Sequence, residues 1–213
     1  YALSIINTYG CKDTDSVVVS AVTSLIADAG SPSNVCLGDS IGLLATGGAN
    51  YEWFPIAGLS NPNIENPKAS PAGDVTYTVV VTSGSCSDTD SVAITVLSLP
   101  TASMSSDTGV CMGDSAQLSA TGAGAGGTYV WSPITGLESD TISNPKASPN
   151  GTTTYTLIIA DNNGCKDTDS VTVNIHILPT ANAGTDTSVC LRDSAQLSGT
   201  GAGVGGTYAW SPG

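Results

Sequence analysis

Apolar and polar side chains alternate along this chain with the period of extended strands. Between Asp169 and Ile177, valine and isoleucine take every second position, with threonine, asparagine and histidine between them. A period of two places the apolar residues on one face, so this segment is predicted to be a half-buried β-strand. Residues 153–160, rich in threonine, tyrosine and β-branched side chains, are predicted to pair with it across the turn at Asn162-Asn163-Gly164.

Shorter strands are predicted earlier in the chain, at residues 115–120 and 129–131, with a glycine-rich loop at residues 122–127 between them. No segment has the 3.6-residue period of an amphipathic helix. A tryptophan on an early strand (Trp131) and a tyrosine on the penultimate strand (Tyr155) are typical of an immunoglobulin-like β-sandwich. The chain is therefore predicted to be all-β.

The same residues recur along the chain at intervals of 75 to 79 residues. The recurring anchors are three sets of residues: Cys11, Cys86 and Cys165; Cys36, Cys111 and Cys190; Trp53, Trp131 and Trp210. The motif Asp-Thr-Asp-Ser-Val also occurs three times, starting at Asp13, Asp88 and Asp167. These intervals predict tandem immunoglobulin-like β-sandwich repeats of 75 to 79 residues.

Aligning the anchors divides the chain into two whole repeats, residues 24–98 and 99–177. Residues 1–23 match the C-terminal part of a repeat, and residues 178–213 match the N-terminal part of another. Repeats of this length are long enough for each to form its own core. The simplest interpretation is that the sequence is a window on a longer tandem array.

Composition narrows the classes of partner. Eighteen acidic side chains against five basic ones give a net charge of -13, which does not attract phosphates. Nucleic acid and membrane surfaces are therefore not expected as partners. Because no apolar run approaches the roughly 20 residues that cross a bilayer, membrane insertion is not expected either. Six cysteines indicate an oxidising compartment, so an export signal is expected outside this sequence.

The residues do not form a recognisable catalytic motif. His176 is the only histidine, so a Ser/His/Asp triad cannot recur in every repeat. The loop at residues 122–127 lacks the Lys-Ser/Thr that follows a phosphate-binding loop, and the cysteine spacings are not those of a zinc knuckle. No enzyme activity is predicted, and no cofactor is expected apart from the calcium considered below.

Four short segments carry a resemblance to a known family: Val110-Cys111-Met112-Gly113-Asp114-Ser115, Tyr129-Val130-Trp131-Ser132-Pro133, Thr154-Tyr155-Thr156 and Asn163-Gly164-Cys165. Together they resemble the immunoglobulin-like or polycystic-kidney-disease-type repeats of Bacteroidota cell-surface proteins, and the resemblance covers the whole chain. Repeats of this type build giant adhesins, including those that resemble the gliding-motility adhesin exported by type IX secretion.

The resemblance implies a structural repeat region of a long extracellular adhesin or surface filament, located on the bacterial cell surface and serving adhesion or gliding motility. The implied partners are neighbouring repeats of the same chain, lateral copies in a filament, and an extracellular surface or glycan at a distal tip. Two alternatives stay open. The repeats could be glycan-binding modules that use loops such as residues 50–52 or 122–127, or a spacer attached to a secreted enzyme.

The cysteines could form disulfides in either of two patterns, or they could remain free thiols. The alternative within each repeat joins Cys36 with Cys86, and Cys111 with Cys165. A sandwich of this strand order places those partners at opposite ends, roughly 26 Å apart, whereas the Cα atoms of a disulfide lie within about 7 Å. Since one repeat would abut the next head to tail, a pairing of Cys36 with Cys165 across the repeat boundary is favoured.

Two acidic residues at the start of a strand, Asp167 and Asp169, project from one face. With Asp39 in the first turn of the preceding repeat, they form a candidate set of oxygen ligands for Ca²⁺ at the boundary between repeats. The alternative is that they keep an exposed strand soluble and discourage edge pairing. The absence of a full EF-hand spacing favours the alternative.

A tripeptide of Asp, Ser or Thr, and an aliphatic residue resembles the O-glycosylation signal of exported Bacteroidota proteins. The candidate acceptors are Ser16, Ser40, Ser91, Ser115, Thr141, Ser170 and Ser194. Glycans at these positions would shield the strands from proteases. The alternative is that such tripeptides arise by chance in repeats rich in aspartate, serine and threonine.

Overall fold

The computed structural model describes residues 1–19 and 24–211, and those residues form β-strands joined by turns and loops. The chain divides into two compact units, Tyr1–Ser98 and Leu99–Gly213, and each unit is described by itself. The predicted repeat boundary after residue 23 and the predicted end of the last partial repeat at residue 213 lie outside the described residues. Within the described ranges there is no helix with the length and apolarity to span a bilayer.

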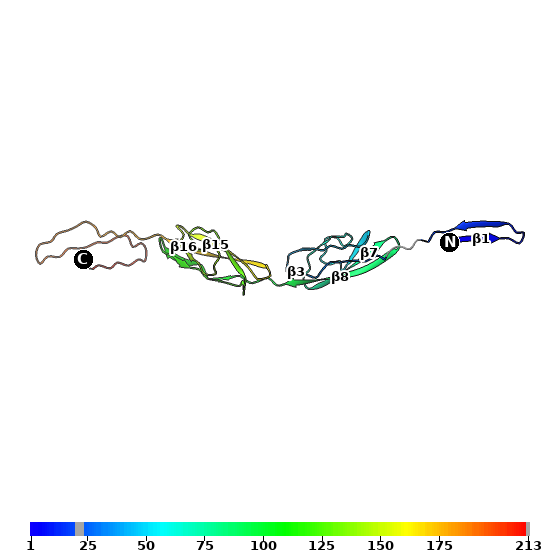
Figure 1. The fold of residues 1–213 in the computed structure, drawn as a ribbon. Coiled ribbons are helices and arrows are strands. Elements are labelled where there is room, and N and C mark those ends of the chain that lie inside the picture. Colours follow the sequence, from blue (N-terminus) through cyan, green and yellow to red (C-terminus); the bar gives the residue numbers. More distant parts are fainter. Residues whose placement is uncertain (20–23, 212–213) are drawn as a thin grey trace. The chain divides into compact units, whose positions relative to one another are not determined.

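The first unit contains a two-layered β-structure, here called sandwich 1 (Figure 1). Its larger sheet has four strands in the order β3 (Ser33–Cys36), β8 (Cys86–Leu97), β7 (Val75–Ser83) and β5 (Asn50–Phe54). Its smaller sheet pairs β4 (Ile41–Gly42) with β6 (Lys68–Ala69). β3 runs parallel to β8, whereas the other pairs are antiparallel, so the first and last strands of the sandwich lie side by side.

The second unit contains sandwich 2, which repeats this arrangement. Its larger sheet has the order β10 (Thr108–Cys111), β16 (Lys166–His176), β15 (Thr153–Ala160) and β13 (Thr128–Ser132), and β10 is again parallel to β16. The opposite layer contains two short pairs, β11 (Ala116–Gln117) with β14 (Lys146–Ala147) and β12 (Ala120–Thr121) with β9 (Ser103–Met104).

Each sandwich has its own core, built around one tryptophan and one tyrosine. Trp53 and Trp131 are buried, and each indole N–H donates to a backbone carbonyl, Ile64 O at 3.0 Å and Ile142 O at 2.8 Å. The hydroxyls of the buried Tyr77 and Tyr155 donate to carbonyls twenty residues earlier in the chain, each at 2.9 Å. This hydroxyl-to-backbone bond resembles the tyrosine corner of immunoglobulin-like domains. The predicted all-β fold of tandem immunoglobulin-like β-sandwiches is confirmed.

The strand predictions differ from the structure where the pairing partner changes. β15 has the predicted bounds. The predicted strand at residues 115–120 is interrupted, because its two ends pair with different strands, β14 and β9. Ile177 was expected on the buried face, but its side chain is 83% exposed because β16 ends at His176.

The segments outside the two sandwiches expose residues whose counterparts are core. Residues 1–19 form one hairpin, β1 (Ala2–Ile6) with β2 (Lys12–Ser16), which corresponds to β15 and β16. Leu3 is 65% exposed there, whereas its counterpart Leu157 is fully buried. Trp210 is 53% exposed, whereas Trp131 is buried. The core of each sandwich therefore depends on strands from both halves of a repeat.

Candidate functional site

The two aspartates of the Asp-Thr-Asp-Ser-Val motif lie at the start of the last strand of each sandwich, and they face the inside of that sandwich. Asp88 and Asp90 stand opposite Val81 and Val79 in the register of β7 and β8, and those two valines are fully buried. Directly paired residues share a face of a sheet, so the aspartates continue the inner row that leads on to Val92. Both residues are of intermediate exposure. The expectation that they keep an exposed strand soluble therefore does not describe their position.

These inward carboxylates bind backbone N–H groups near the beginning of the same sandwich. Asp88 Oδ2 accepts from Ala27 N, and Asp90 Oδ2 accepts from Ala29 N, both at 2.8 Å. In sandwich 2, Asp167 Oδ2 accepts from Ala102 N at 2.8 Å. Each bond gives a partner to a backbone N–H group in a segment with little strand pairing. It also connects the first segment of the sandwich to its last strand. We call these contacts the aspartate clasps.

The clasps favour the ionised form of the aspartate side chain. Hydrogen bonds from the backbone N–H groups of Ala29 and Ser91 lower the pKa of Asp90 from its ordinary value of 3.8. Those from Ala102 and Thr168 lower the pKa of Asp167 in the same way. A carboxylate that accepts such bonds is stabilised relative to the neutral acid. Acid should therefore loosen the clasps.

Replacing Asp167 by asparagine is expected to lower the melting temperature of sandwich 2 at pH 7 and to flatten its dependence on pH. A depressed folded-state pKa contributes stability that is present above the unfolded value, near 4, and is lost as the pH falls through the folded value. The neutral amide keeps an acceptor oxygen but not the charge. Thermal melts between pH 7 and pH 2 measure both effects.

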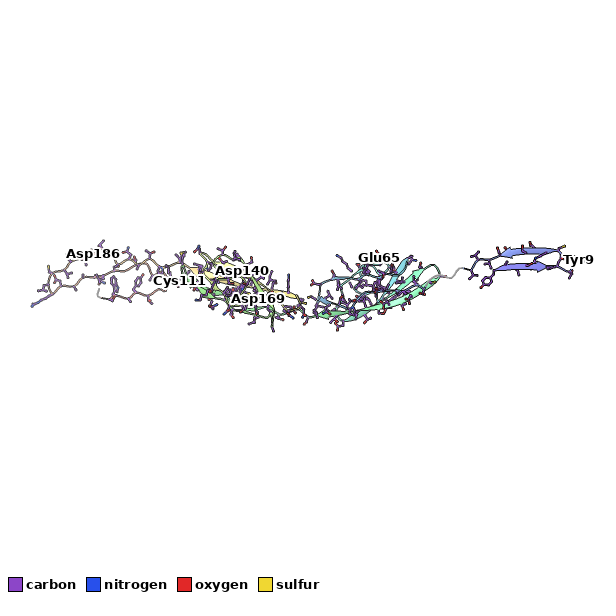
Figure 2. All side chains as sticks on the ribbon, viewed as in Figure 1. Tyr9, Glu65, Cys111, Asp140, Asp169 and Asp186 are labelled. Atoms are coloured by element: carbon purple, nitrogen blue, oxygen red, sulfur yellow. The ribbon has the colours of Figure 1, made fainter. Side chains whose placement is uncertain are left out.

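Asp169→Asn is the matched control, because Asp169 Oδ1 accepts only a bond from the adjacent Ser170 N–H among the hydrogen bonds described. Asp169 is labelled in Figure 2. We expect this variant to keep the wild-type pH profile. Equal profiles for Asp167→Asn and the wild type would show that the clasp does not contribute to stability.

The predicted calcium ligands are only partly placed by the structure. Asp167 is engaged with Ala102 N, as described above. Among the described residues, no three or more histidine, cysteine or acidic side chains form a group that could hold a metal ion. The site formed by Asp39, Asp167 and Asp169 stays a prediction. Thermal melting with and without millimolar Ca²⁺ tests it, and an unchanged midpoint would remove it.

The cysteines occupy two positions in each sandwich. Cys36 ends β3 opposite Leu97, the last residue of β8, and Cys111 ends β10 opposite His176 in the same way. The other position lies at the opposite end of the last strand, where Cys86 opens β8. Cys165 immediately precedes β16.

The division into disulfide-bonded and free cysteines does not follow these two positions. Cys36 and Cys165 are disulfide-bonded. Cys11, Cys86, Cys111 and Cys190 are free thiols. The twelve residues of β8 span about 36 Å, far more than the roughly 7 Å allowed between the Cα atoms of a disulfide. The alternative pairing within each repeat, Cys36 with Cys86 and Cys111 with Cys165, therefore does not fit this structure.

The seven predicted glycosylation acceptors are all exposed. They lie in the two sandwiches and in the flanking segments, at Ser16, Ser40, Ser91, Ser115, Thr141, Ser170 and Ser194. Ser91 Oγ shares a hydrogen bond of 2.8 Å with Thr78 Oγ1 on the neighbouring strand. Glycosylation stays a prediction, and the intact mass of the protein purified from its source tests it: a mass equal to that of the bare polypeptide would exclude it.

A surface hollow lies beside residues 50–52, which were expected to form a glycan-binding loop but belong to strand β5, where they pair with β7. It has a volume of about 380 Å³, and its polar lining includes Asn50, Tyr51, Asn63 and Glu65. The Tyr51 hydroxyl donates to Gly48 O at 2.9 Å, which fixes the ring at the rim. Figure 2 labels Glu65. In sandwich 2, the counterparts of Asn50 and Glu65 are Thr128 and Ser143, so the two sandwiches differ at this place.

The comparisons with known proteins concern the fold. No protein-family model and no curated relative matches the chain. Extracellular domains 3–5 of Drosophila OTK match with 10% identity and a TM-score of 0.42, covering 82% of this chain and 70% of that one. The titin I-band fragment I67–I69 matches with 14% identity and a TM-score of 0.38, covering 75% and 68%.

The eight N-terminal Ig domains of Down Syndrome Cell Adhesion Molecule match with 14% identity and a TM-score of 0.34, covering 94% of this chain and 36% of that one. Similarity at this level does not extend beyond the fold. The assignment rests on the strand order of each sandwich, its buried tryptophan and its tyrosine corner. On that evidence, the chain is composed of immunoglobulin-like β-sandwich repeats.

Proposed function

We propose that the chain is a structural repeat region of a long extracellular adhesin or surface filament, serving adhesion or gliding motility. The observation that carries this proposal is the succession of two sandwiches with the same strand order, each with its own core. The number of such units determines how far the filament extends from the cell, and each folded unit resists being stretched. The proposal places the protein on the surface of a bacterial cell, after type IX secretion.

The chemistry of the sandwiches supports a mechanical role. The repeated side chains, Trp131, Tyr155 and Asp167 and their counterparts, all bond to backbone atoms of their own sandwich. What recurs from one sandwich to the next is therefore the set of residues that hold it together. The partners in this proposal are neighbouring repeats, lateral copies of the filament, and a surface or glycan contacted by a distal tip.

Antibody fragments raised against residues 24–177 test the proposed location and role. They should label intact cells of the source organism without permeabilisation, and labelling should disappear in cells that lack type IX secretion. An in-frame deletion of residues 24–177 should reduce attachment or gliding. Labelling only after permeabilisation, or a deletion without effect on either behaviour, would contradict the proposal.

A second candidate function is glycan binding by sandwich 1, favoured by the hollow beside Asn50. Its amide and carboxylate groups offer donors and acceptors to sugar hydroxyls, and the Tyr51 ring offers an apolar surface at the rim. Glycan-array binding should then be lost in Asn50→Ala and Glu65→Ala but kept in the matched controls Thr128→Ala and Ser143→Ala. Array binding that is absent from the wild type, or equal in all four variants, would reject this candidate.

A further inference from the structure

We propose that Asn150 is the site of a spontaneous covalent modification, in which its side-chain amide is lost as ammonia and an aspartyl or isoaspartyl residue takes its place. Asn150 stands immediately before Gly151, in an exposed turn of sandwich 2 that leads into β15. The reaction needs only water as a co-reactant. It does not rest on the proposed function.

The chemistry is an intramolecular acyl transfer. The backbone nitrogen of Gly151 attacks Cγ of Asn150, so that an N–Cγ bond forms and the Cγ–Nδ2 bond breaks. The side-chain amide leaves as ammonia and takes the proton of the Gly151 N–H group with it, and a cyclic imide remains. Water then opens this ring. Cleavage of the new N–Cγ bond gives aspartate, whereas cleavage of the original peptide bond gives isoaspartate, whose backbone runs through the side-chain carbon atoms.

The turn at Asn150 leaves the attacking nitrogen accessible. In the part of the chain that the structure describes, no hydrogen bond from Gly151 N is found, and Gly151 O accepts from Thr153 Oγ1 at 2.8 Å. Asn150 and Gly151 are both exposed. A Cβ atom placed on Gly151 would meet no atom within 4 Å. The Asn150 side chain therefore has room to fold back onto the nitrogen of the next residue.

The other Asn-Gly pair of the sequence, Asn163-Gly164, is held differently. It lies in the exposed turn between β15 and β16, where Gly164 N donates to Asp161 O at 3.1 Å and Asn163 N donates to Asp161 Oδ1 at 2.8 Å. The nitrogen that would attack Asn163 Cγ is thus already bonded, and the reaction there must first break that bond. A hydrogen bond of ordinary net strength slows such a step about fivefold.

Sandwich 1 has the same turn without the reactive side chain. Its counterpart of Asn150-Gly151 is Ala72-Gly73, and Gly73 is likewise exposed, with no atom within 4 Å of an added Cβ. The modification is therefore specific to sandwich 2. Its product adds a negative charge beside Thr152, whose Oγ1 accepts from Ile175 N at 3.1 Å and so connects the approach to β15 with the end of β16.

Peptide mapping of the aged chain tests the proposal. The full chain is incubated in a mildly alkaline buffer, both folded and in denaturant, and is then reduced, alkylated and digested with trypsin. Cleavage after Lys146 and Lys166 places both Asn150 and Asn163 in the peptide of residues 147–166. Fragment ions of this peptide show which asparagine has gained the mass of an amide NH₂ exchanged for OH.

In the folded chain, we expect Asn150 to be converted at least about fivefold faster than Asn163. The difference should shrink toward equality in denaturant, because the turn around Asp161 is then lost. An unconverted Asn150 in the folded chain, or equal rates for the two asparagines there, would overturn the proposal.

Two substitutions separate the mechanism from simple hydrolysis of the amide. Gly151→Ala should slow the conversion of Asn150 several-fold, because the methyl group crowds the attacking nitrogen, and the open space at this position accommodates it. Ala72→Asn should transfer the reaction to sandwich 1. A rate at Asn150 that Gly151→Ala leaves unchanged, or a folded Ala72→Asn chain that is not converted at residue 72, would contradict the proposal. None of these results bears on surface location or adhesion.

Discussion

Replacing Trp131 by alanine is expected to remove the thermal unfolding transition of sandwich 2 while leaving that of sandwich 1 in place. Removing a buried tryptophan side chain costs roughly 3–5 kcal/mol. A domain of this size has a total stability of roughly 4–12 kcal/mol. The loss also leaves Ile142 O, which accepts the indole N–H at 2.8 Å, without that partner. Calorimetry of the full chain under reducing conditions measures the two transitions separately.

Trp53→Ala should have the same effect on the other sandwich: the transition of sandwich 1 is lost and that of sandwich 2 is retained. Trp210→Ala is the matched control, because that side chain is 53% exposed and its removal leaves no cavity in a core. A Trp131→Ala chain that keeps both transitions would show that the tryptophan is not the centre of its core. Simultaneous loss of both transitions would contradict the independence of the two cores.

Much of each sandwich can be predicted from the alternation of side chains. The pattern at residues 153–160 predicts β15, because the buried residues Tyr155, Leu157 and Ile159 alternate with outward ones. The pattern fails at residues 115–120, where hydrogen-bond partners switch between two neighbouring segments. A strand interruption of that kind depends on the partners, which a local pattern does not contain.

The aspartate clasps show which part of a site escapes sequence reasoning. The two-residue spacing of Asp167 and Asp169 correctly predicts that both project from one face. The same spacing continues to Val171, which is buried, so the face that the sequence analysis expects to be exposed is the inner one. Their partner is a backbone N–H, that of Ala102, with no side-chain signal. Contacts of this kind become visible only once the strands are placed.

Pulling single molecules of the reduced chain from its two ends tests most directly the claim that it consists of separately folded units in series. The account predicts two separate unfolding events, each releasing roughly 25 nm, with one event lost in Trp53→Ala and the other lost in Trp131→Ala. A smooth extension without force peaks, or one event that releases both lengths together, would contradict it.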